Sequence, residues 1–262
     1  MQPTFLGIGV QRAATTWLHN RLAEHPEIFV PAEKEIQFFN LEDHQSKGLA
    51  WYLSHFHSAD RESAVGEITP TYLHEADPRE VADMFPGLKL IVVLRDPVDR
   101  AFSAFTLVSH RFPGKSFGDV CHRPYFFGHS LYADKLRLWA DVFGWDNLCV
   151  QLYEDIQDRP RDALRKFFQF LGVDADFQPS GVEEHINRII YPGLQSRLDT
   201  LRLGWAKEIV KRTPIGDWIR QRHIRSIGGA GRQIRHRLVA NFLGDIEETE
   251  KLINRDLSSW KS

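Results

Sequence analysis

Two segments of this sequence place polar and basic residues directly after apolar, β-branched runs. Gly9–Leu18 (GVQRAATTWL) combines small side chains with Arg12 and two hydroxyls, and Arg95–Ser103 (RDPVDRAFS) begins with a cation and ends with a hydroxyl. Small side chains let backbone amides approach a phosphate, a helix N-terminus adds a positive dipole end, and an arginine adds a full charge. The residue types and their spacing therefore predict two binding sites for phosphate-like anions.

Each segment also has a purely structural interpretation. The first is compatible with an ordinary strand-to-helix turn in which a threonine caps the helix. In the second, Arg95 is placed to form an ion pair with Asp96 or Asp99, and Pro97 fits the first turn of a helix.

The first segment differs from the phosphate loop of kinases and NTPases. That loop reads G-x-x-x-x-G-K-[ST], whereas this sequence lacks the second glycine and carries Arg12 in place of the lysine, at a different offset. The apolar run that ends at Leu94 is followed by a cation, not by the aspartate with which such enzymes hold magnesium. We therefore expect a phosphate-bearing ligand and no metal ion. A P-loop kinase or NTPase and a non-catalytic nucleotide-binding module stay open as alternatives.

The order of the elements explains why these segments would meet. Strands are expected at residues 4–10, 64–68, 88–94 and 148–153, and helices at 15–24, 98–110, 131–143, 161–171 and 239–260. Strands that alternate with helices indicate an α/β fold, a parallel sheet flanked by helices, here within a single domain of residues 1–262. Ligands of such sheets bind at the carboxyl ends of the strands, which both anion segments follow.

Composition narrows the class of protein. The 262 residues have a formal net charge of −2, so a general attraction to nucleic acid or to an anionic membrane is not expected. Two cysteines are too few for a disulfide scaffold, and no apolar run approaches the ~20 residues of a membrane span. Together with a start that carries no basic leader, these features predict a cytoplasmic protein; they do not address the oligomeric state.

The sequence resembles sulfotransferases that use 3′-phosphoadenosine 5′-phosphosulfate (PAPS) and release 3′-phosphoadenosine 5′-phosphate (PAP). The loop after the first strand is similar to their 5′-phosphosulfate loop, P-K-x-G-T-T, and Arg95 with Ser103 eight residues later matches their 3′-phosphate motif. Residues 31–40 (PAEKEIQFFN) and 66–72 (GEITPTY) are similar to the heparan sulfate N- and 3-O-sulfotransferase branch, and residues 150–155 and 254–260 to its bacterial members. The resemblance implies a P-loop-NTPase-like sulfotransferase fold and covers nearly the whole chain except residues 190–236.

The resemblance assigns roles to individual residues. Glu35 matches the catalytic carboxylate and would act as general base, and Arg12 stands where the family has its loop lysine. Arg95 and Ser103 would hold the 3′-phosphate of the donor. The 5′-phosphosulfate would be held by the threonine hydroxyls and backbone amides of Ala13, Ala14, Thr15, Thr16 and Trp17. Without the resemblance, the preferred interpretation of Glu35 is one surface charge in the run Glu33–Glu35.

The sequence departs from the family pattern at two places. Ala13 and Ala14 replace glycines, which fits the anion only if neither position needs a positive φ. Ile68 stands where the heparan sulfate enzymes have a functional lysine. His74, six residues on, is a candidate acid or base in its place, with a solvent-facing loop histidine as the plainer interpretation.

A basic stretch at residues 207–237 has nine Lys or Arg against two Asp or Glu. Arg225 or Arg232, beside the glycines at 228, 229 and 231 that suggest a mobile loop, would contact the PAPS phosphates as a lid. Alternatively, the stretch binds an anionic acceptor or is a solvated helical face. The acceptor itself, a hydroxyl or amine of a glycan, a natural product or a carrier-tethered substrate, is not specified by the residues.

Overall fold

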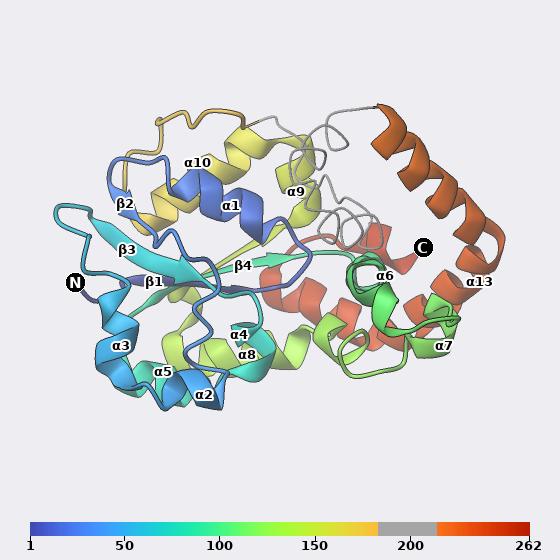
Figure 1. Cartoon of the computed structure of the whole chain (residues 1–262), viewed down its shortest axis with the longest axis horizontal. Helices are drawn as coiled ribbons and strands as arrows, with labels where there is room; N and C mark the ends of the chain where they lie inside the picture. The colour runs from blue at the N-terminus through green and yellow to red at the C-terminus, as the bar shows by residue number, and fades with distance from the viewer. Residues whose placement is uncertain (183–213) are drawn as a thin grey trace, which may run out of the picture. The chain divides into compact units, whose positions relative to one another are not determined.

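Five parallel strands form one sheet in the order β2-β3-β1-β4-β5 in the computed structural model of the chain (Figure 1). The strands are β1 (Phe5–Gly9), β2 (Ile28–Phe29), β3 (Ala64–Ile68), β4 (Lys89–Leu94) and β5 (Leu148–Leu152). The structure describes the backbone of residues 1–182 and 214–262, and the side chains of 1–182 and 233–262. The predicted fold class, a parallel sheet flanked by helices, is confirmed.

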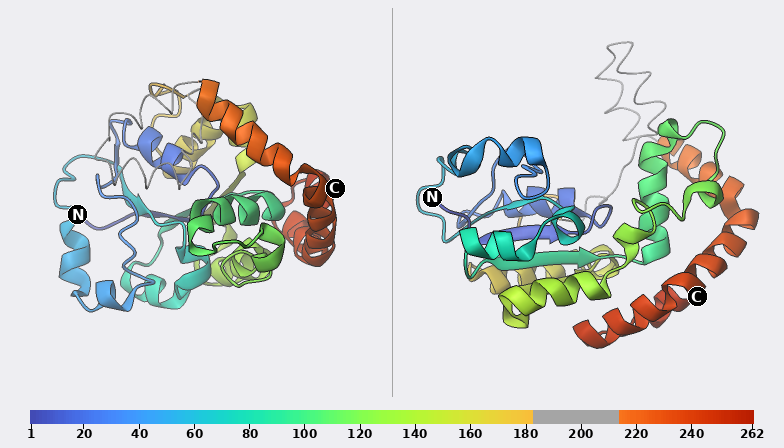
Figure 2. Two further views of the ribbon diagram at one scale, coloured as in Figure 1. Left: turned by 45° about the vertical axis from the view of Figure 1, so that its right-hand side comes forward. Right: turned by 90° about the horizontal axis from the view of Figure 1, so that it is seen from below.

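The sheet belongs to the first of two compact units, which holds Met1–Arg95 and Tyr132–Ile186. Its helices are α1 (Thr15–Leu22), α2 (Glu42–Gln45), α3 (Gly48–Ser54), α4 (Tyr72–Glu75), α5 (Pro78–Met84), α8 (Ala133–Phe143), α9 (Tyr153–Asp158) and α10 (Pro160–Leu171), with a short 3-10 turn at Trp145–Asn147. Helices α1 and α10 lie on one face of the sheet, and α4, α5 and α8 on the other (Figures 1 and 2). Both faces are therefore covered, which explains why every residue of β1 and β3 is buried.

The central strand β1 and its neighbour β3 approach each other closely. Phe5 of β1 is in register with Gly66 of β3, and a Cβ on Gly66 would lie 2.2 Å from the Phe5 carbonyl oxygen. A glycine is therefore required at position 66 for this strand pairing. The next residue of β3 is the fully buried Glu67.

The second unit holds Asp96–Leu131 and Asn187–Ser262. Its described helices are α6 (Pro97–Val108), α7 (Phe117–Val120) and α13 (Pro214–Ile253), with 3-10 turns at Ser109–Arg111, Gly128–Ser130 and Ser258–Lys261. Asp96 caps α6, because its carboxylate accepts hydrogen bonds from the amides of Val98 (2.9 Å) and Asp99 (3.0 Å), and Pro97 follows at the first helical position. The assignment of residues 1–262 to a single domain stays a prediction.

Two expectations about the elements were wrong. The glycine cluster at 228–231 lies within α13, so the backbone there is helical and the expected loop is absent. The last helix, expected at 239–260, begins at Pro214 and ends at Ile253, before the 3-10 turn at Ser258–Lys261. In addition, the two-residue strand β2 was not predicted.

Candidate active site

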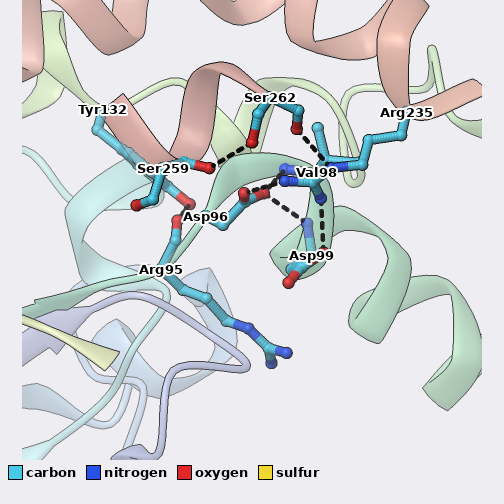
Figure 3. A network of polar contacts seen from close by, with 8 residues as sticks. All are labelled: Arg95, Asp96, Val98, Asp99, Tyr132, Arg235, Ser259 and Ser262. Atoms are coloured by element: carbon cyan, nitrogen blue, oxygen red, sulfur yellow. Dashed lines mark hydrogen bonds and ion pairs between the residues drawn. The ribbon is translucent and has the colours of Figure 1, made fainter. Parts of the chain in front are cut away.

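Arg95 connects the ends of three strands. It directly follows β4, and its Nη1 donates to the carbonyl of Arg12 in the loop after β1, at 2.8 Å. Its guanidinium carbon lies 4.4 Å from the ring centre of Tyr153, the residue that follows β5. Its own carbonyl accepts a hydrogen bond of 2.9 Å from the hydroxyl of Tyr132 (Figure 3). The guanidinium is therefore held at the carboxyl edge of the sheet, where the sequence places an anion site.

The loop between β1 and α1 has an unusual backbone. Arg12 and Ala14 adopt φ angles of 75° and 63°, in the left-handed region that favours glycine. The sequence made the fit of an anion conditional on neither alanine needing a positive φ; Ala13 meets that condition and Ala14 does not. Ala14 keeps its methyl group buried, so the loop accommodates alanine at a backbone cost of roughly 1 kcal/mol.

Helix α1 begins at Thr15 with no side-chain hydrogen bond to its N-terminus within the described residues, and its first turn has no acidic residue. Thr16 is exposed and Thr15 is buried. The first backbone amides of an α-helix have no partner inside the helix, and the dipole there is positive. The first turn of α1, beside Arg12, therefore has the donors that a phosphosulfate group requires, so this part of the site fits PAPS.

Only the backbone of Trp17 is available to the predicted phosphosulfate site. Its side chain is buried, and its indole Nε1 donates to the carbonyl of Val182 at 3.3 Å. This hydrogen bond links α1 to residue 182 of the same unit.

Glu35 lies on the loop that follows β2, in a left-handed conformation with φ of 64°. Its carboxylate is about one-third exposed (36%) and pairs with the Lys34 ammonium at 2.6 Å. Glu33, two residues earlier, is 73% exposed and lies 3.5 Å from His55. Glu35 is therefore less exposed than its neighbour and is held in a specific backbone conformation, which a simple surface charge does not require.

A buried polar cluster supports this loop. The carboxylate of Glu67 accepts hydrogen bonds from the hydroxyls of Thr69 (2.6 Å) and Tyr72 (2.7 Å). These hydroxyls in turn accept from the backbone amides of Gln37 (3.3 Å) and Phe38 (2.8 Å). Burial raises the pKa of Glu67, and the bonds from Thr69, Tyr72 and the Ile36 amide partly oppose that rise.

Position 68, where the resembled enzymes have a lysine, holds an apolar side chain in a buried strand. Ile68 is buried and lies where a Cβ on Gly7 would be 2.7 Å from its Cγ1, so it belongs to the interface of β1 and β3. His74 lies in the short helix α4, its ring 6.5 Å from that of Tyr132, and its carbonyl accepts from the Lys135 ammonium at 3.1 Å. His74 is thus half-buried near the strand ends, and its catalytic role stays a prediction.

Ser103 lies in α6 of the second unit, whereas Arg95 belongs to the first, so their joint binding of a 3′-phosphate stays a prediction. Within the second unit, Arg235 of α13 binds both carboxylates at the start of α6. Its Nη2 lies 2.6 Å from Asp96, its Nη1 lies 2.9 Å from Asp99, and its Nε donates to the Ser262 carbonyl at 2.8 Å (Figure 3). The alternative in which these aspartates serve to pair Arg95 is thus not needed, since Arg235 neutralises them.

The side chains of Arg225 and Arg232 lie outside the described residues, and so does most of the basic stretch at 207–237. Arg235, one of the basic residues of this stretch whose side chains are described, binds carboxylates of the protein itself, which is a structural use of that charge.

Sequence reasoning missed the roles of Tyr153, Tyr132 and the Glu67 cluster. A signal was present for Glu67, because an acidic residue in the middle of an apolar strand is costly unless it is hydrogen-bonded. Tyr153 and Tyr132 gave no comparable signal, since a tyrosine beside a strand is ordinary core composition.

Comparisons with known proteins agree on one family. A family model described as "Sulfotransferase domain" matches residues 2–220. The bifunctional heparan sulfate N-deacetylase/N-sulfotransferase 4 of Mus musculus is 29% identical over 202 residues, which are 68% of this chain and 23% of that protein. The heparan sulfate glucosamine 3-O-sulfotransferase 3B1 of Mus musculus is 31% identical over 183 residues, which are 65% of this chain and 46% of that protein. The chain therefore spans less than half the length of either relative.

A solved structure matches the chain over its entire length. A sulfotransferase from Alicyclobacillus acidocaldarius superposes with a TM-score of 0.74 at 26% identity, and the match covers 100% of both chains. In the part of the chain that the structure describes, no helix has the length and apolar character needed to cross a membrane.

Proposed function

Because this chain belongs to the sulfotransferase domain family, we propose that it transfers the sulfuryl group of PAPS to a hydroxyl or amine of an acceptor. PAPS supplies the sulfuryl group and leaves as PAP. The observation that carries the proposal is the joining of Arg95 to the Arg12 carbonyl beside the first turn of α1. That contact brings two cations and a helix N-terminus to the carboxyl edge of one sheet.

Each candidate residue has a separate role in the proposed transfer. Glu35 would accept the proton of the acceptor, since its carboxylate is partly exposed on a fixed loop. Arg12 and the first amides of α1 would stabilise negative charge on the 5′-phosphate side, and Arg95 would bind the 3′-phosphate. Ser103 would complete that second site. The predicted role of His74 would be a second acid or base near the strand ends.

The acceptor class is the less defined part of the proposal. Relatives that are named for heparan sulfate support a glycan acceptor, hydroxyl or amine. A small natural product and a carrier-tethered hydroxyl stay as further candidates. We also propose a cytoplasmic location, which is supported by the free thiols of Cys121 and Cys149.

Glu35→Gln tests the role of the carboxylate. We expect transfer of label from ³⁵S-PAPS to the best acceptor of a panel to fall about 100-fold or more, because a general base contributes roughly 10²–10⁴-fold. PAP affinity, measured by calorimetry, should stay within about twofold, since Glu35 does not bind the donor phosphates. The panel contains an unsulfated glucosamine polysaccharide, a phenol and a carrier-bound β-hydroxyacyl chain.

Glu33→Gln is the matched control, two residues away on the same loop and 73% exposed. Its transfer rate should equal that of the wild type. Full activity of Glu35→Gln would remove Glu35 from the mechanism, and a wild type that labels no acceptor would contradict the proposed function.

A further inference from the structure

Three consecutive backbone amides after Glu35 donate into one buried cluster. The Ile36 amide bonds to the Glu67 carboxylate, the Gln37 amide to the Thr69 hydroxyl and the Phe38 amide to the Tyr72 hydroxyl. The cluster comes from a different part of the chain, which runs from Glu67 in β3 to Tyr72 at the start of α4. The segment that carries Glu35 is thus attached to the sheet by its backbone, through side chains more than thirty residues away.

The direction of every hydrogen bond in the cluster depends on Glu67. A backbone amide can only donate, so the oxygens of Thr69 and Tyr72 must accept from Gln37 and Phe38. Each hydroxyl has one proton, and both protons go to Glu67, at 2.6 and 2.7 Å. A group at position 67 must therefore accept at both of its terminal atoms, which a carboxylate does and a carboxamide does not.

The attached segment holds two residues in a costly conformation. Glu35 and Gln37 have φ angles of 64° and 57°. For residues with a side chain, each such angle costs on the order of 1 kcal/mol and persists only where the surroundings enforce it. The enforcing contacts are the amides on either side of Gln37 and the His44 ring, whose Nδ1 lies 2.7 Å from the Ile36 carbonyl.

Stability alone does not explain a carboxylate at position 67. Glu67 is 1% exposed, and Tyr52 and Tyr72 beside it are also fully buried. Replacement of buried charged groups by well-packed apolar ones is often neutral or stabilising, so a buried carboxylate is a poor choice for stability.

We propose that Glu67 is a positioning residue that fixes the Glu35 carboxylate for proton transfer by orienting Thr69 and Tyr72 toward the amides of residues 37 and 38. The proposal rests on the proposed role of Glu35 as base. Glu67 itself touches neither donor nor acceptor, so its effect reaches the reaction only through the Glu35 loop.

A double-mutant cycle of Glu67→Gln with Glu35→Gln tests the coupling. Glu67→Gln alone should lower kcat by about 10–100-fold, the effect of misplacing a catalytic group by about 1 Å, with PAP affinity within about twofold. In the Glu35→Gln background, the same change should cause no further loss, because a residue that acts only through Glu35 has nothing left to position.

Amide hydrogen exchange supplies a readout that is independent of turnover. In Glu67→Gln, exchange at Gln37 and Phe38 should be at least about tenfold faster than in the wild type, because their acceptors are reoriented. Thr249→Val removes another fully buried hydroxyl, in α13, and should leave both exchange and kcat unchanged. Thr69→Ser keeps the hydroxyl and should retain most of the activity.

Tyr72→Phe is the second variant if Glu67→Gln does not fold, as judged by loss of PAP binding. It deletes the link to Phe38 while Thr69 stays in place, and the same pattern is expected at smaller size. A wild-type kcat for these variants, or an equal further loss in the Glu35→Gln background, would overturn the positioning role while the proposed function stands. An active Glu35→Gln would overturn the positioning role together with the role of Glu35 as base, and a wild type that labels no acceptor would overturn the proposed function itself.

Discussion

The contacts of Arg95 hold its guanidinium in one orientation. Its guanidinium has five N–H donors in a rigid fork, and one of them is used on the Arg12 carbonyl. The stacking on Tyr153 fixes the plane of the fork without consuming a donor. The side chain is thus oriented before any ligand arrives, which lowers the entropy cost of binding a phosphate.

Arg95→Ala should weaken PAP binding about 10–100-fold and 5′-AMP binding by less than about threefold, because a charge-assisted bond to the 3′-phosphate contributes roughly 1.5–3 kcal/mol. Isothermal titration calorimetry with both nucleotides measures the difference. Arg61→Ala is the control, since that side chain is 94% exposed and pairs only loosely with Asp60 at 3.6 Å. Equal losses for PAP and 5′-AMP would show that Arg95 does not read the 3′-phosphate.

Some site residues could be predicted from sequence and others could not. Arg12 and Arg95 could be proposed as candidate-site residues because each comes within two residues of the end of an apolar run, and the ends of parallel strands are where such folds bind ligands. The positive φ of Ala14 could not be predicted, because alanine gives no local reason for a left-handed backbone. The positioning role proposed for Glu67 could not be predicted either, because it depends on backbone amides about thirty residues away that come close only in the folded chain.

Among the elements, α6 and α13 of the second unit are joined by one arginine. Arg235 is 30% exposed and binds Asp96, which is 6% exposed, as well as Asp99. Burial, and then the charge of Asp99, raise the pKa of Asp96 above its ordinary 3.8 even with Arg235 in place. The start of α6, the helix that carries Ser103, therefore depends on a charge supplied by α13.

Arg235→Ala should destabilise the protein by about 1–3 kcal/mol, the cost of leaving a buried carboxylate unpaired, reduced here because Arg235 is partly exposed. The loss should be largest above the raised pKa of Asp96. As the pH falls through that pKa toward 3.8, Asp96 becomes neutral and the difference from the wild type should shrink.

Urea unfolding at several pH values measures this dependence. Arg237→Ala, two residues on in the same helix, is the control, since within the described residues its guanidinium makes one weak contact, to the Cys121 sulfur at 3.9 Å. A deficit for Arg235→Ala that stays constant with pH would show that Asp96 is not the group left unpaired.

The elements were predicted best where local pattern and burial agree. The four longer strands fall within two residues of their expected bounds, because buried parallel strands are continuous β-branched runs. Strand β2 has two residues, too few to form a pattern. Helix α13 was missed at its start because each glycine costs a helix about 1 kcal/mol, a local penalty that the 228–231 region nevertheless bears.

At the scale of the whole molecule, the net charge of −2 conceals how the cations are used. Arg95 is oriented at the sheet edge, whereas Arg235, from the most basic stretch of the chain, neutralises internal carboxylates. The charge density of a stretch therefore does not by itself indicate an anion site, and the prediction of anion binding rests on the strand ends, where parallel sheets bind ligands.

Calorimetric titration of the wild-type chain with PAP, with 5′-AMP and with ATP plus magnesium tests the central claim most directly. A PAPS-dependent sulfotransferase should bind PAP without magnesium and at least about tenfold more tightly than 5′-AMP, since the 3′-phosphate adds a charged contact. Tighter, magnesium-dependent binding of ATP would contradict this account in favour of a kinase or NTPase, and the absence of PAP binding would contradict it in favour of a non-catalytic module.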